Sequence, residues 1–62
     1  RNKLSERELE IINLLAKGMS YKMVATECFI SIDTVRTYIK RIYEKLQVHS
    51  VTEAVHKVFI QK

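Results

Sequence analysis

The segment from Ser31 to Leu46, S-I-D-T-V-R-T-Y-I-K-R-I-Y-E-K-L, constrains the fold of this chain more than any other. Its large aliphatic residues recur at spacings of three and four, which places them along one face of an α-helix. These residues are Ile32, Val35, Ile39, Ile42 and Leu46. The segment therefore predicts a helix that packs one side into a hydrophobic core.

The other side of this predicted helix is basic and rich in hydroxyl groups. It carries Arg36, Lys40, Arg41 and Lys45, with Thr34, Thr37 and Tyr38 among them. Such a surface suits an anionic partner, although a merely solvated helix face is the simpler alternative. The segments that flank this helix decide between the two.

Four serines mark the places where helices are expected to begin. Ser5, Ser20, Ser31 and Ser50 each precede a stretch with helical apolar spacing. A serine at the N-cap accepts a hydrogen bond from an otherwise unpaired helix N–H, which contributes about 1 kcal/mol. The predicted helices span residues of about 6–17, 21–28, 32–46 and 51–60. The fold class is therefore all-α, a compact four-helix domain.

Further local signals support these boundaries. Ser5 with Glu8, and Ser50 with Glu53, have the spacing of a reciprocal capping box. Gly18 fits the position after the first helix, where a left-handed backbone is needed.

Each helix is expected to contribute one apolar face to the core. In the first, the face is Leu9, Ile12, Leu15 and Ala16, with Ile11 on its flank and Glu8 on the same side. In the second it is Val24, Ala25 and Cys28, extended by Phe29 and Ile30 in the turn. In the last it is Val51, Ala54, Val55, Val58 and Phe59.

The composition fits one small globular domain over residues 1–62. The chain has no proline and one glycine, and its formal net charge is +4 with a pI near 9.5. That charge permits nucleic-acid binding without proving it. No apolar run has the roughly 20 residues that a membrane-spanning helix needs, and no signal peptide is visible. Because the chain begins at Arg1 rather than at methionine, we expect it to be a piece of a longer protein.

The second and third predicted helices have the arrangement of a helix-turn-helix. A short turn separates them and the second of the pair is basic. Ala25 is small where the two helices must approach closely, and Val24, Ile30 and Val35 are placed to clamp them together. In this arrangement the outer face of residues 32–46 projects into the major groove of double-stranded DNA.

The basic face then divides into two groups of side chains. Arg36, Thr37 and Lys40 share the outward face near the first half of the helix, the part that reaches base edges. The remaining candidates lie where phosphates flank the groove, and their contacts set affinity and salt dependence. These phosphate candidates are Lys22, Ser31, Thr34, Tyr38, Arg41 and Lys45.

Several short motifs occur in an order that resembles the LuxR/GerE-type helix-turn-helix domain. They are L-S-E-R-E-L-E-I-I-N-L-L-A-K-G-M-S, then V-A, then I-S-I-D-T-V-R-T-Y-I-K-R-I-Y-E-K-L-Q-V, then T-E-A-V. The resemblance covers about Leu4 to Val58. It implies the C-terminal output domain of a bacterial, cytoplasmic transcription regulator, such as a two-component response regulator or a quorum-sensing regulator, that binds DNA as a dimer. By this resemblance Arg36, Thr37 and Lys40 fall on the family's base-reading positions.

Four positions depart from the family pattern. Tyr21 stands where a small polar residue, commonly Asn, is usual, and Tyr38 stands where His is common. Gln47 replaces a small turn residue such as Gly or Asn. Val51 stands where Arg is typical, which puts a family salt bridge at that place in doubt.

The last helix has two candidate uses. The resemblance implies an isologous dimer interface formed by Val51, Ala54, Val55 and Val58. The alternative is that these residues only close the core of a small domain, and the sequence leaves both readings open.

Nothing in the sequence indicates an enzyme, a cofactor or a metal site. His49 and His56 have no cysteine or carboxylate at a recognised metal-ligand spacing, and there is no phosphate loop or nucleophile motif. Cys28 is expected to be a buried free thiol. Two alternatives to the LuxR type are a protein-interaction module that uses the same basic face and the promoter-reading domain of a sigma factor. The E-R-E and T-E-A-V motifs favour the LuxR type over both.

Overall fold

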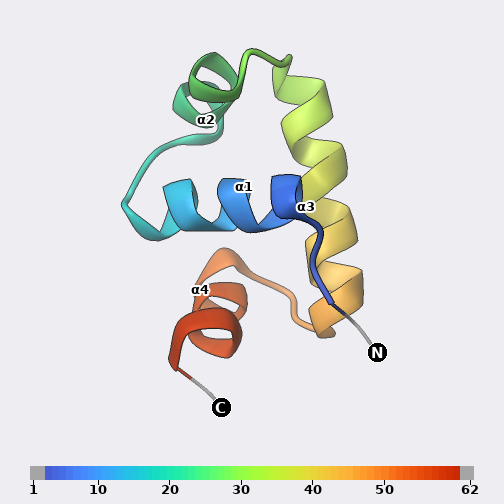
Figure 1. Cartoon of the computed structure of the whole chain (residues 1–62). Helices are drawn as coiled ribbons and strands as arrows, with labels where there is room; N and C mark the ends of the chain where they lie inside the picture. Colours follow the sequence, from blue (N-terminus) through green and yellow to red (C-terminus); the bar gives the residue numbers. More distant parts are fainter. Residues whose placement is uncertain (1–2, 61–62) are drawn as a thin grey trace.

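The computed structural model describes residues 3–60, in which every regular element is helical. The elements are α1 (Glu6–Ala16), α2 (Tyr21–Cys28), α3 (Ile32–Leu46), α4 (Val51–Val55) and the π-helical segment η1 (His56–Ile60). Helix α1 lies against α3, with α2 on one side of it and α4 on the other (Figure 1). The all-α, four-helix fold class is confirmed.

All four serines cap the helices that follow them. Their hydroxyl oxygens accept hydrogen bonds from the backbone N–H three residues later, at 3.1 to 3.2 Å. The capping box of Ser5 and Glu8 is complete, because the Ser5 N–H also donates to Glu8 Oε1 at 2.8 Å. The second expected box is only half formed. Glu53 Oε1 accepts from the His49 N–H at 2.7 Å instead of from Ser50.

The first three helices end in the same way. Each is followed by a residue in the left-handed backbone region: Gly18 (φ 96°), Phe29 (φ 59°) and Gln47 (φ 58°). The next N–H then donates to a carbonyl five residues back, as in a Schellman motif. These bonds run from Met19 to Leu14 at 3.3 Å, from Ile30 to Ala25 at 3.0 Å and from Val48 to Tyr43 at 3.0 Å. The expected role of Gly18 is confirmed, and it is the one residue of the three that adopts this backbone without strain.

The core lies where the four helices meet. Its residues are Ile11, Ile12, Leu15, Val24, Ala25, Cys28, Val35, Ile39, Ile42, Val48 and Ala54. The expected buried thiol of Cys28 is confirmed, with 2 % of its surface exposed. Four residues of the predicted core are instead exposed, so their assignment is wrong: Leu9, Ala16, Phe29 and Phe59.

The prediction for α1 was wrong because the buried face of the helix is rotated slightly about the helix axis relative to the predicted face. The buried residues are Glu8, Ile11, Ile12 and Leu15, so the face is centred on Ile11 and Ile12 rather than on Leu9 and Ala16. The helix also ends at Ala16, one residue before the predicted end, because Lys17 forms the cap. Phe29 lies outside the core because the left-handed turn at its own position redirects the chain.

The end of the chain departs from the predicted α-helix over residues 51–60. Regular α-helix stops at Val55, and residues 56–60 have π-helical hydrogen bonding, which has five-residue rather than four-residue closure. Ala54 is fully buried and packs into the core, as the core alternative for the last helix predicts. Val51, Val55 and Val58 pack against the core but remain partly exposed.

An ion pair between buried Glu8 and partly exposed Lys45 joins the start of α1 to the end of α3. Lys45 Nζ donates to Glu8 Oε1 at 2.8 Å, and the Glu8 side chain is 3 % exposed. Burial by itself raises the pKa of Glu8. The hydrogen bonds from Lys45 and Ser5 and the charge of Lys45 outweigh burial, so the pKa is lowered below 4.5.

This ion pair predicts an acid-sensitive contribution to stability. Because folding lowers the pKa of Glu8, the contribution is complete above the unfolded pKa near 4.5 and is lost as the pH falls through the folded pKa. Glu8→Gln should lower the free energy of unfolding at pH 7 by about 1–3 kcal/mol and flatten its acid dependence. Urea titrations between about pH 3 and pH 7 measure both.

The matched control is Glu10→Gln. Glu10 pairs with Arg7 at the surface, where its side chain is 51 % exposed, so little change is expected. An undiminished acid dependence in Glu8→Gln would assign that dependence to other carboxylates.

Candidate nucleic-acid interface

The outer face of α3 presents the three residues expected to read bases. Arg36, Thr37 and Lys40 are all exposed, and the buried residues of the helix lie on its other side. Arg36 and Lys40 are one turn apart, which separates them by about 6 Å along the helix axis. Two base steps of B-DNA span about the same length.

Thr37 is already partly engaged. Its hydroxyl donates to the carbonyl oxygen of Asp33 at 3.1 Å. The proton is therefore directed back along the helix, and the methyl group remains available. Of the two contacts that a threonine makes with bases, the apolar one with a thymine methyl fits this arrangement better.

Two hydroxyl groups lie together at the first turn of α3. Ser31 Oγ accepts from the Thr34 N–H at 3.1 Å and lies 2.9 Å from Thr34 Oγ1. One hydroxyl proton bridges the two oxygens, so the other proton is free to donate outward. Both side chains are exposed, as a phosphate contact requires.

The basic side chains of this face differ in whether they form ion pairs within the domain. Arg36, Lys40 and Arg41 take part in neither of the two ion pairs found within residues 3–60. Lys45 is instead held by Glu8, a partner that the sequence analysis did not identify. Lys22 on α2 is exposed, whereas Tyr38 is half-buried against the core. Arg36, Lys40 and Arg41 on α3, with Lys22, are therefore the cations best placed to meet phosphates or bases.

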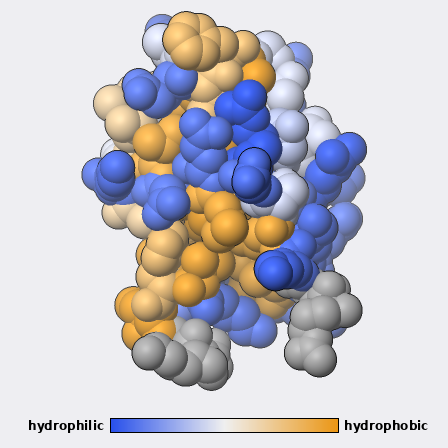
Figure 2. Space-filling model, viewed as in Figure 1, coloured by the Kyte–Doolittle hydropathy of each residue, from blue (hydrophilic) through white to orange (hydrophobic). Residues whose placement is uncertain are grey.

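The charge of this face is modest. Asp33 and Glu44 are exposed on the same helix as the three unpaired cations. Figure 2 shows hydrophilic side chains along the α3 side of the molecule, whereas apolar surface gathers around α1 and α4. The face is therefore polar without being strongly basic.

The structure also pairs two tyrosines that the sequence analysis did not connect. Burial first, and then a hydrogen bond with Tyr21, raises the pKa of Tyr43 to about 12. Tyr21 is the first residue of α2, so the two side chains meet between α2 and α3.

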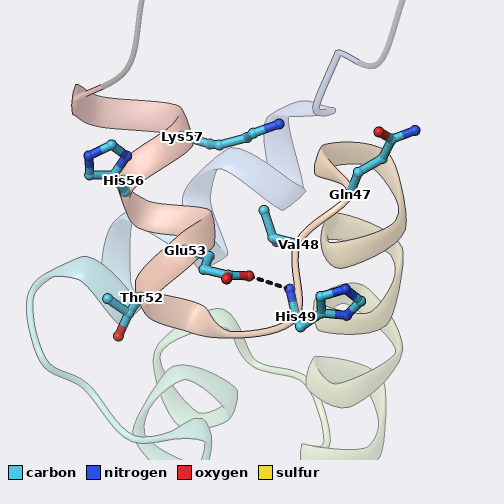
Figure 3. Close-up of a pocket in the computed structure, with 7 residues that line it drawn as sticks. All are labelled: Gln47, Val48, His49, Thr52, Glu53, His56 and Lys57. Carbon is cyan, nitrogen blue, oxygen red and sulfur yellow. Dashed lines mark hydrogen bonds between the residues drawn. The ribbon is translucent and has the colours of Figure 1, made fainter.

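A shallow pocket of about 420 Å³ lies between the end of α3 and α4 (Figure 3). Its lining includes His49, Glu53 and His56, but the two imidazole rings do not face each other. The dashed contact in Figure 3 is the helix-capping bond from the His49 N–H to Glu53. Residues 3–60 contain no group of three His, Cys, Asp or Glu side chains arranged to hold a metal ion.

None of the helices between residues 3 and 60 is long and apolar enough to cross a membrane. No solved structure matches the chain at a significant level.

Comparison with known proteins identifies the family. Residues 2–58 match the model of bacterial regulatory proteins of the luxR family. The chain is also 45 % identical over 56 residues to the response regulator protein VraR of Staphylococcus aureus, with the same values for VraR of S. saprophyticus and S. epidermidis. Each match covers 90 % of this chain and 27 % of the relative, so the chain spans about a quarter of the length of these proteins. The chain therefore belongs to the luxR family of bacterial regulatory proteins, whose helix-turn-helix domain is a DNA-binding module rather than an enzyme.

Proposed function

We propose that this domain binds double-stranded DNA sequence-specifically, with α3 as the recognition helix in the major groove. The observation that carries the proposal is the outer face of α3. There Arg36 and Lys40 are exposed, unpaired and one turn apart, beside a threonine whose methyl group is free. Arginine and lysine pair with O6 and N7 of guanine, and the threonine methyl suits thymine.

Phosphate contacts would hold the helix in this position. The free hydroxyl proton of the Ser31–Thr34 pair, together with Lys22 and Arg41, supplies donors around the groove. Tyr38 and Lys45 remain weaker candidates, because one is half-buried and the other is engaged by Glu8.

The proposed binding unit on DNA is a homodimer. Val51, Val55 and Val58 are the partly exposed apolar residues at the end of the chain that support this. A two-fold dimer reads two half-sites about 10 base pairs apart, or a multiple of that distance. An interface formed by three valines is too small to hold a stable dimer by itself, so we expect DNA binding to promote dimerisation.

The longer protein is proposed to be a cytoplasmic transcription regulator of the response-regulator type. The support is the 45 % identity to VraR, a response regulator protein. The match covers 27 % of that relative, so the similarity concerns this domain alone. The response-regulator type of the longer protein is therefore a proposal.

The test is duplex binding at several salt concentrations. We expect log K to fall with log salt by about 0.9 for each phosphate neutralised, and competition by unrelated duplexes to be weak. Affinity that does not change with salt, or equal affinity for all duplexes, would refute sequence-specific binding by this face.

A further inference from the structure

Phe29, in the turn between α2 and α3, combines two unfavourable features. Its side chain is 93 % exposed, and its backbone is left-handed, with φ at 59°. The left-handed region is unfavourable for a residue with a Cβ atom, because Cβ approaches the following carbonyl oxygen too closely. Its ring is too exposed to recover that cost by packing within the domain. Residues with strained backbone cluster at functional sites.

The position of Phe29 is fixed by the turn itself. Its N–H donates to the Thr26 carbonyl at 3.3 Å, and the Ile30 N–H donates to Ala25 at 3.0 Å. Ile30 is half-buried against the core, and Ser31 then caps α3. The ring therefore projects from a well-defined backbone rather than from a loose loop.

This position adjoins the proposed interface. Phe29 precedes Ser31 by two residues, and two residues span at most about 7 Å. Ser31 and Thr34 are the hydroxyl pair whose free proton is proposed to meet a phosphate. A phenylalanine ring beside that pair comes within reach of the deoxyribose attached to the same phosphate.

We propose that Phe29 is a DNA-contacting residue whose ring packs against a deoxyribose at the edge of the groove that α3 occupies. This inference rests on the proposed function and adds an apolar contact to it. A deoxyribose is present at every nucleotide, so the contact strengthens binding to all sequences alike. It differs from a phosphate contact because it neutralises no charge.

The surroundings of the ring favour DNA over a protein as its partner. The other exposed large apolar residues are Leu9, Met23, Phe59 and Ile60, and none of them lies in this turn or on α3. The core of a protein interface is an apolar cluster. A single ring two residues from the Ser31–Thr34 hydroxyl pair instead resembles the mixed surface that faces a sugar-phosphate backbone.

The test uses Phe29→Gly and Phe29→Asn, because both replacements accept a left-handed backbone. We expect the free energy of unfolding to stay the same or rise. We expect affinity for a duplex that the unaltered chain selects from a random library to fall about tenfold, the equivalent of burying one small apolar contact. The slope of log K against log salt should not change. Phe29→Tyr keeps the ring and should keep the affinity.

Gln47→Gly is the matched control, because Gln47 has the same strained backbone at the other end of α3. It should gain stability and leave DNA affinity unchanged. Unaltered affinity in both Phe29→Gly and Phe29→Asn would refute the inference alone and assign the ring to a protein partner. A fall in stability that parallels the fall in affinity would make the ring structural. Failure of the unaltered chain to bind any duplex would instead refute the proposed function and this inference with it.

Discussion

Arg36→Ala and Lys40→Ala are each expected to lower affinity for the selected duplex by about 10- to 100-fold, since a bidentate contact to guanine contributes about 1–3 kcal/mol of discrimination. Each change should also relax preference at one base pair, with the two positions about two steps apart. The reason is the one-turn spacing of these two exposed, unpaired cations on α3. Titration of each variant against every single-base change in the duplex measures both effects.

Lys22→Ala is the matched control, because it removes an equal charge from the exposed surface of α2. It should weaken all duplexes alike and reduce the salt slope by about 1. Thr37→Val and Thr37→Ser separate the two possible roles of Thr37. The valine variant should keep the thymine preference and the serine variant should lose it. A uniform effect of all these changes across the panel would contradict the division between base and phosphate contacts.

Val55→Asp is expected to weaken binding to a two-half-site duplex by about 100-fold while leaving a single half-site unaffected. Linking two half-site contacts in one dimer gains a factor of 10² to 10⁴, and a charge in the proposed interface removes that link. Val55 is only partly buried, so an aspartate there can keep its carboxylate in water. Val58→Asp should behave in the same way.

The control places the same charge nearby. Thr52→Asp adds a carboxylate at an exposed position of α4 and should leave two-site binding nearly unchanged. Circular dichroism checks that each variant is folded. If Val55→Asp and Val58→Asp lose their helical signal, these valines belong to the core alone and the proposed dimer interface is refuted.

The regular part of the fold was predictable from local chemistry. Serine caps and apolar spacing located α2 and α3 with the correct bounds, because helix ends depend on hydrogen bonds within a few residues. The spacing of Ser5 and Glu8 likewise predicted a capping box that is complete, whereas the same spacing at Ser50 and Glu53 gave half of one. The same local rules placed Arg36, Thr37 and Lys40 on the outer face of α3.

Features that depend on contacts between distant segments were not predictable in this way. Lys45 looked like a surface cation until α1 brought Glu8 against it, 37 residues earlier in the chain. The sequence left Ala54 open between the core and a dimer interface, and the packing of α4 buries it fully in the core. Phe29 was expected in the core because it is apolar. Its left-handed backbone instead leaves the side chain exposed to solvent.

The most direct test of the central proposal replaces single guanines in the selected duplex. A 7-deazaguanine lacks the N7 acceptor in the major groove, whereas hypoxanthine lacks only the N2 donor in the minor groove. If Arg36 and Lys40 read guanines from α3, 7-deazaguanine should reduce affinity at the positions assigned to them, and hypoxanthine should not. The opposite pattern, loss with hypoxanthine and none with 7-deazaguanine, would contradict α3 as a major-groove recognition helix.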